Sequence, residues 1–219
     1  MLPFTREEFL TVFGSYNAAV WPAQPIGYVL GAVALLALWR SGESYQRAAL
    51  GILSAMWLWT GLAYHWLFFA EVNPAAVVFA LLFFLQGLGF ARVASARQLP
   101  FRFAWRPGVQ SVVGAALIGY AFVLYPLVDL LTGSWPRMPA FGISPCPVTL
   151  FTLGLLLLGR PRPPWWLWII PVAWSLLGGT AAFLLGIPQD WVLLLGGPAA
   201  LLIAFGRSPV RPAPSNPIR

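Results

Sequence analysis

The sequence predicts an all-α, polytopic membrane protein, and three observations carry that prediction. Of its 219 residues, 59% are hydrophobic and only 9% are charged, and the mean hydropathy is +0.77. A soluble domain carries about 25% charged residues, so this chain has too few charges to cover a soluble surface. Long apolar segments follow one another along the chain, which predicts a single transmembrane helical domain over residues 1–206.

Each predicted span is an apolar run bounded by charged residues, Pro or Gly, the residue types that end transmembrane helices. A helix that crosses the hydrocarbon core needs roughly 20 residues. The seven predicted spans are Gln24–Trp39, Ala48–Ala70, Pro74–Val93, Val109–Leu131, Phe141–Gly159, Trp165–Gly186 and Asp190–Gly206.

The N-terminal segment, residues 1–22, differs from the spans. Thr5 and Glu8 form a capping box, and Phe4 and Phe9 flank it as a hydrophobic staple. The helix after this box is too short and too charged at its start to cross a membrane. We therefore expect a short helix that lies in the membrane interface.

The arginines predict the orientation. When the loops are numbered alternately, eleven Arg fall on one side and only Arg6 and Arg137 on the other. By the positive-inside rule, the Arg-rich side is cytoplasmic. The N-terminus is thus expected outside and the C-terminus inside, with residues 207–219, which contain four Pro and no apolar run, as a disordered cytoplasmic tail. The eleven are Arg40, Arg47, Arg92, Arg97, Arg102, Arg106, Arg160, Arg162, Arg207, Arg211 and Arg219.

The fifth span is unusually short. Its helical part, Cys146–Gly159, would be about 21 Å long, against a hydrocarbon core of roughly 30 Å. The preceding residues 141–145 must cover the rest as irregular chain, which is tolerated only where protein surrounds it. The alternative is a re-entrant loop, but that would place Arg160 and Arg162 outside.

Polar side chains gather in the outer halves of the spans, while the inner halves are almost entirely apolar. Lipid makes such groups costly, so they are the default functional candidates. On a regular helix Thr60, Tyr64 and Glu71 share a stripe with His65 beside it. We predict a polar ligand-binding site or ion pathway that opens outward. Its predicted residues are Tyr64, His65, Glu71, Asn73, Tyr125, Asp129, Cys146, Thr149, Gln189 and Asp190.

These residues also have purely structural interpretations, which the sequence leaves open. His65 can hydrogen-bond a neighbouring helix, and Cys146 can be an ordinary small buried residue. Asp129 and Asp190 can be solvated helix ends, and residues 71–73 can be loop and cap residues. Most of the 12 Trp are expected to anchor the helices at the membrane interfaces.

Composition excludes several kinds of chemistry. All 13 basic residues are Arg, so no lysine Schiff base can form. The single Cys146 allows neither an intramolecular disulfide nor a cysteine metal cage, and the single His65 cannot pair with a second histidine on a metal within one chain. No paired carboxylates, histidine cluster or Ser–His pair indicates an enzyme. We expect no catalytic residues, no metal, no cofactor and no nucleic-acid partner.

Several strings together resemble a bacterial family of multi-pass membrane proteins that is known as a domain of unknown function. They are Tyr16-Asn17, Val20-Trp21-Pro22, Ala63-Tyr64-His65-Trp66, Phe68-Phe69, Glu71-Val72-Asn73-Pro74-Ala75, Tyr125-Pro126, Pro145-Cys146-Pro147 with Thr149 and Phe151-Thr152, Gly178-Gly179 and Pro188-Gln189-Asp190. The resemblance extends to about Phe205. It implies a protein of the bacterial inner membrane and carries no activity.

Two functions remain at this point. One is a small-solute or ion permease, or a sensor, with its site in the outer half of the bundle. The other is a non-catalytic membrane subunit or scaffold that a partner completes. Besides the lipid bilayer, the partners left open are a second copy of the chain and a larger membrane complex.

Overall fold

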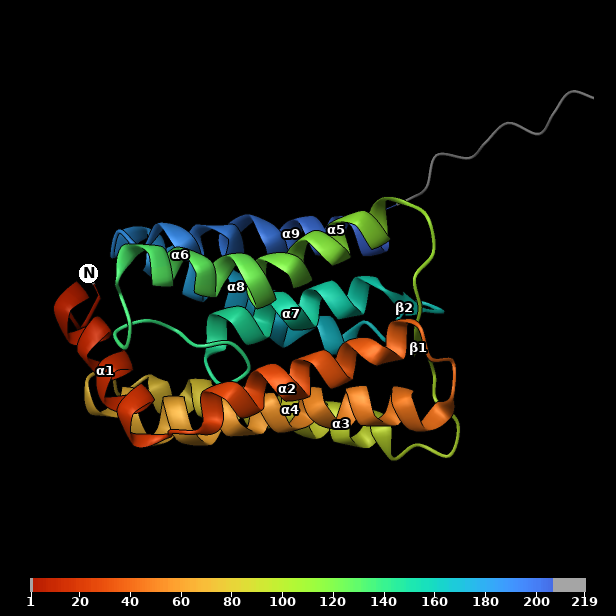
Figure 1. Cartoon of the computed structure of the whole chain (residues 1–219), viewed down its shortest axis with the longest axis horizontal. Helices are drawn as coiled ribbons and strands as arrows, with labels where there is room; N and C mark the ends of the chain where they lie inside the picture. Colours follow the sequence, from red (N-terminus) through yellow and green to blue (C-terminus); the bar gives the residue numbers. More distant parts are fainter. Residues whose placement is uncertain (1, 207–219) are drawn as a thin grey trace, which may run out of the picture.

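Apolar helices run side by side along the long axis of the molecule, and only α1 lies across it (Figure 1). This computed structural model describes residues 2–206, with the side chain of Asp129 left out. The predicted tail, 207–219, lies outside the described residues. The all-α prediction is confirmed, since the regular structure described is helical apart from one two-stranded pair.

The elements in chain order are α1 (Arg6–Ala19), α2 (Ala23–Leu35), η1 (Leu36–Leu38), α3 (Glu43–Trp59), η2 (Thr60–Phe68), η3 (Phe69–Glu71), α4 (Ala76–Ala94), β1 (Arg102–Phe103), α5 (Val109–Gly119), η4 (Tyr120–Leu124), α6 (Tyr125–Thr132), α7 (Pro145–Leu157), β2 (Gly159–Arg160), α8 (Trp166–Leu184), η5 (Pro188–Asp190) and α9 (Trp191–Phe205).

Five helices are long and apolar enough to cross a membrane. They are Glu43–Glu71, Ala76–Ala94, Val109–Thr132, Trp166–Leu184 and Pro188–Phe205, each with at least 18 residues. The pair α1 and α2, bent by 85° between its two parts, makes a sixth if it is counted as one span. The helix α7 has only 13 residues. Length and apolarity therefore support a membrane protein, whereas they do not confirm the seven predicted spans.

The short helix α7 occupies the middle of the molecule. It lies between a layer formed by α2, α3 and α4 and a second layer formed by α5, α6, α8 and α9 (Figure 1). Every residue from Met138 to Gly159 is buried. The irregular chain before α7 is thus enclosed by protein, as non-helical backbone at membrane depth requires.

Two helices contain π-helical segments, in which each turn holds an extra residue. The segment η4 directly precedes Pro126, which has no N–H to offer the carbonyl of Phe122. The N–H of Tyr125 reaches back five residues to the carbonyl of Tyr120. In η2, the consecutive residues Ala63, Tyr64 and His65 are all buried.

Glycines allow the helices to approach closely within the chain. A Cβ on Gly114 of α5 would lie 2.8 Å from the carbonyl oxygen of Gly154 in α7, and one on Gly154 would lie 2.7 Å from that of Gly114. Similarly, a Cβ on Gly179 of α8 would lie 2.6 Å from the backbone nitrogen of Leu194 in α9. Such contacts between small residues are typical of membrane helices.

One end of the bundle, here called the strand end, is closed by the pairing of β1 with β2, which joins the loops before α5 and α8. Gln46 is 1% exposed and holds this end together. Its Nε2 donates to the carbonyls of Ala37, Arg40 and Phe103, and its Oε1 accepts from Phe103 N–H at 2.7 Å. Arg47 of α3 donates to Ala94 and Ala96 at the end of α4.

The opposite end, here called the α1 end, is closed by α1 and the loop before α7. Asn17 Nδ2 donates to the carbonyls of Pro136 and Met138, each at 2.7 Å. Arg137 forms an ion pair with Glu7 across the same contact. The N-terminal helix therefore packs on the bundle as part of the fold.

Candidate functional site

The chain before α1 folds onto the bundle because its first turn is capped. Thr5 Oγ1 accepts from Glu8 N–H at 3.2 Å, and Glu8 Oε2 accepts from Thr5 N–H at 2.7 Å and from the Thr5 hydroxyl. The hydrogen bond from the Thr5 backbone lowers the pKa of Glu8. With the helix start fixed, Phe4 is buried, with its ring 5.1 Å from that of Phe69.

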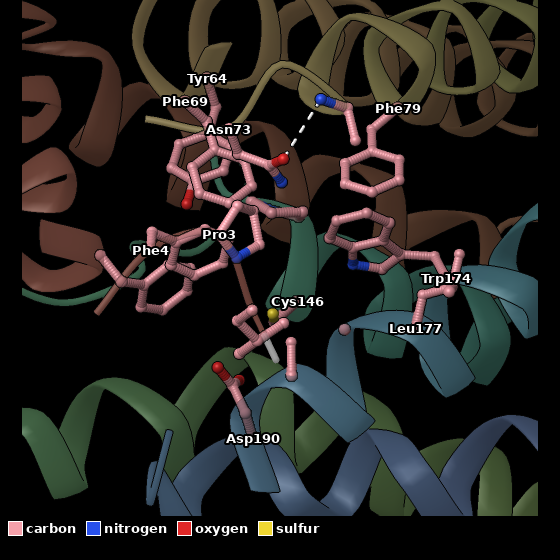
Figure 2. Close-up of a pocket in the computed structure, with 16 residues that line it drawn as sticks. Pro3, Phe4, Tyr64, Phe69, Asn73, Phe79, Cys146, Trp174, Leu177 and Asp190 are labelled. Carbon is pink, nitrogen blue, oxygen red and sulfur yellow. Dashed lines mark hydrogen bonds between the residues drawn. The ribbon is translucent and has the colours of Figure 1, made fainter. Parts of the chain in front are cut away.

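A cavity of about 270 Å³ lies at the α1 end, between this N-terminal segment and the bundle (Figure 2). Its walls are largely aromatic and aliphatic. Pro3 and Phe4 lie on one side of it in this view, with Trp174 and Leu177 of α8 opposite them. The lining residues are Leu2, Pro3, Phe4, Phe9, Tyr64, Phe69, Asn73, Ala75, Phe79, Pro145, Cys146, Trp174, Leu177, Gly178, Ala181 and Asp190.

A carboxyl group and a thiol face each other in this cavity. Asp190, at the end of η5, is fully buried, and its Oδ1 accepts a hydrogen bond from the Tyr125 hydroxyl. The thiol of Cys146, near the start of α7, lies beside the Asp190 carboxyl group and near the Trp174 indole (Figure 2). Among residues 2–206, Asp190 Oδ2 accepts no hydrogen bond of ordinary geometry, and the neighbouring thiol is only a weak donor.

Tyr64 and His65, neighbours in η2, are both buried without hydrogen-bond partners among the described residues. The Tyr64 ring stacks on Phe13 at 4.8 Å and lines the cavity. His65 lies behind the cavity wall, with ring centroids 4.5 Å from Phe83 and 4.9 Å from Trp174. A buried polar group without a partner costs about 1–3 kcal/mol, so these positions destabilise the fold.

The predicted site residues divide into three groups. Tyr64, Asn73, Cys146 and Asp190 line the cavity. His65, Tyr125 and Thr149 are buried outside the lining set, with Tyr125 attached to it through Asp190. Glu71 is exposed, and Gln189 lines a different hollow beside Arg137. The side chain of Asp129 lies outside the described residues.

Asn73 has a structural role as well as its place in the lining. Its Oδ1 accepts from Ala75 N–H at 3.2 Å, just before α4 (Figure 2). This is an Asx turn, in which the side-chain oxygen accepts from the backbone N–H two residues further on; the N-cap of α4 itself is Ala75. Asn73 is therefore explained by the local fold, whereas Tyr64 and Asp190 are not.

Sequence reasoning missed the aromatic walls, namely Phe4, Phe79 and Trp174. The position of Trp174 gives a signal, because it lies near the middle of α8 and not at an end, where interfacial Trp anchors are found. Phe4 and Phe79 carry no comparable signal, since they meet only through the tertiary fold. Among residues 2–206, no three His, Cys, Asp or Glu side chains gather closely enough to hold a metal ion.

Comparison with known proteins identifies the family to which this chain belongs. A family model described as a family of unknown function, DUF6064, matches residues 6–212. The chain belongs to DUF6064. The predicted resemblance to a family of unknown function is thereby confirmed. No curated protein and no solved structure matches the chain, so membership of DUF6064 carries no activity for the cavity.

Proposed function

We propose that this protein is a multi-pass protein of the bacterial inner membrane that binds a small, largely apolar solute at the α1 end, as a permease or a sensor does. The observation that carries the proposal is the cavity of about 270 Å³, where one oxygen each of Tyr64 and Asp190 has no partner in the part of the chain that the structure describes. Sites for small molecules are typically apolar hollows with a few polar groups that orient the ligand.

A solute with one hydrogen-bonding group fits this lining better than an ion. Asp190 supplies the one carboxylate among the described lining residues, and it already accepts from Tyr125. The Tyr64 hydroxyl can donate to or accept from a ligand. The remaining walls would strip water from an ion without replacing it, which costs several kcal/mol.

The proposal includes the topology of seven spans with the α1 end outside. In its support, α2 and α7 run parallel to the five long helices (Figure 1). Three Arg-bearing loops also gather at the strand end, where Arg102 donates to Ser41 and pairs in a strand with Arg160. A reporter fused after Arg219 should be active only in the cytoplasm, and periplasmic activity there would contradict this topology.

The binding test uses Cys146, the only thiol of the chain. In membrane vesicles, N-ethylmaleimide should label Cys146 through the cavity. Ala181→Phe places a ring in the lining and should slow labelling several-fold. Leu184→Phe, one turn further along α8 and 64% exposed, adds its ring on the surface and should leave the rate unchanged.

Protection of the same thiol tests the kind of solute. Benzyl alcohol has an apolar ring and one hydroxyl group, and it should slow labelling of the unmodified protein. Benzenesulfonate has a similar ring with a full charge, and it should not. Equal labelling of the two variants without protection by either compound would contradict a binding site and would favour the scaffold function.

A further inference from the structure

Two further cavities lie at the strand end, at the opposite end of the bundle from the cavity described above. The larger has a volume of about 560 Å³ and the smaller about 150 Å³. They adjoin, since Arg160 of β2 and Gln110 of α5 line both. Arg106 lines the larger one, and Arg162 and Trp168 line the smaller.

Two arginines that line these cavities are held in place by the fold. Arg160 Nη1 donates to the carbonyls of Leu157 at 2.7 Å and Gly159 at 2.8 Å, which fixes its guanidinium at the junction of the cavities. The Arg162 guanidinium lies 4.8 Å from the centre of the Phe205 ring. Both cations are thus positioned by carbonyl oxygens and an aromatic ring.

A buried donor here has no partner. Trp168 is 1% exposed, and its Nε1 makes no hydrogen bond within residues 2–206. An unpaired N–H in a buried position is costly unless something outside the protein accepts from it. Because Trp168 lines the smaller cavity, an acceptor bound there is the nearest source of the partner that this N–H lacks.

The start of α5 adds backbone donors. Gly108 precedes α5 with φ +147° and no side-chain cap, and there is open space where a Cβ would lie. The hydrogen bonds at this helix start come from Ser111 and Val112 to Gly108. Gly108 lines the larger cavity together with Val109, and a helix start of this kind favours an anion.

No carboxylate lines either cavity in the described part of the chain. The acidic residue whose ion pairs lie at this end, Glu43, pairs with Arg47 and Arg102. Burial and the neighbouring charge of Arg106 lower the pKa of Arg160. An anion that binds between two like charges relieves their repulsion.

We infer that the strand end is a binding site for a phosphate group, which Arg106, Arg160 and the Trp168 N–H hold between α5 and α9. The guanidinium groups match phosphate oxygens in geometry and charge. Exposed Val109 and Leu202 give the larger cavity an apolar edge, so a lipid phosphate with its chains along the bundle fits, as does free phosphate.

The test compares two variants with a matched control in the purified full-length protein. Arg106→Gln removes a guanidinium for which no intramolecular ion pair or hydrogen bond is described, so the fold should persist. Trp168→Phe removes the unpaired N–H together with part of the buried indole ring. Arg92→Gln removes the same charge from a position near the end of α4 that lines neither cavity.

Two probes distinguish the source of the phosphate. Inorganic phosphate is titrated by calorimetry, and phosphatidylglycerol and phosphatidylcholine are compared by native mass spectrometry of retained lipid. The affinity for the probe that binds should fall roughly tenfold in Arg106→Gln, since a charge-assisted hydrogen bond is lost, and should fall in Trp168→Phe as well. Arg92→Gln should bind as the unmodified protein does.

Each result decides the inference. Retention of phosphatidylglycerol without binding of inorganic phosphate supports the site with a lipid as its source. Binding of inorganic phosphate with equal retention of the two lipids supports it with a soluble source. Failure of both probes to bind would overturn the inference. An equal loss of affinity in Arg92→Gln and Arg106→Gln would also overturn it, because general attraction to positive charge would then explain the binding.

Discussion

The two ends of the bundle differ in how many of their buried polar groups lack a partner among the described residues. At the strand end, Gln46 uses both its amide nitrogen and its amide oxygen in hydrogen bonds to the backbone. At the α1 end, Tyr64, His65 and one oxygen of Asp190 have no partner among the described residues. At the strand end, the indole N–H of Trp168 also has no partner among the described residues, and Trp168 lies in the proposed phosphate site.

This contrast shows at which end unpaired polar groups lower the stability of the fold. Folded proteins leave few buried polar groups unpaired, and those that remain need an explanation. Violations of local rules concentrate at functional sites, because the groups are arranged for a ligand and not for the fold. At the strand end, the polar groups outside the proposed phosphate site therefore stabilise the fold. At the α1 end, the unpaired groups are the ones that we expect to bind a ligand.

The largest effect is expected at the strand end. Gln46→Leu keeps a similar volume but leaves the Phe103 N–H and the Ala37 carbonyl without partners, so it should destabilise the protein by about 3 kcal/mol. Gln98→Leu changes an exposed residue and should alter stability by less than about 0.5 kcal/mol. Equilibrium unfolding in mixed micelles measures both, and equal effects would remove the contrast between the two ends.

An effect of opposite sign is expected at the α1 end. Tyr64→Phe deletes an unpaired hydroxyl and should stabilise the ligand-free protein by about 1 kcal/mol. Tyr16→Phe makes the same chemical change where the hydroxyl donates to Ile143 at 2.7 Å and accepts from Trp59 at 2.9 Å, and it should destabilise by a similar amount. Thermal unfolding compares them. Destabilisation by Tyr64→Phe would show that its hydroxyl is already satisfied.

The smallest effect concerns the cap of α1. Hydrogen bonds from Thr5 lower the pKa of Glu8 below its ordinary value of 4.5. Because the folded pKa is depressed, the cap stabilises α1 above that value and is lost as the pH falls through the folded pKa. A carbon-13 titration of the Glu8 carboxyl should give a midpoint below 4.5. Thr5→Ala should raise this midpoint, whereas Ser15→Ala should not.

The helices could be predicted well from the sequence, because lipid forces backbone polar groups into helices and selects long apolar runs. The predicted Ala48–Ala70 lies inside the continuous helix Glu43–Glu71, for example. The fifth span shows the limit. Its shortness was evident from the sequence, but the enclosure of residues 138–159 depends on neighbours that come before and after it in the chain.

Only four of the predicted residues line the cavity, because depth can be estimated from sequence whereas direction around a helix cannot. The stripe of Thr60, Tyr64 and Glu71 assumes a regular helix. The π-helical η2 adds residues to its turns, and each extra residue rotates the later part of the helix by about 100°. Glu71 lies beyond η2, in the 3-10 turn η3 that ends the helix, and is exposed, while Tyr64 lines the cavity.

The enclosure of α7 has a consequence for how the protein is made. Most membrane helices enter the bilayer singly and pack afterwards. A helix of 13 residues is about 20 Å long and cannot cover the hydrocarbon core alone. Its neighbours α8 and α9 are synthesised after it. In the proposed seven-span topology, we therefore expect α7 to enter the bilayer only together with α8 and α9, so that its insertion and its packing form a single step.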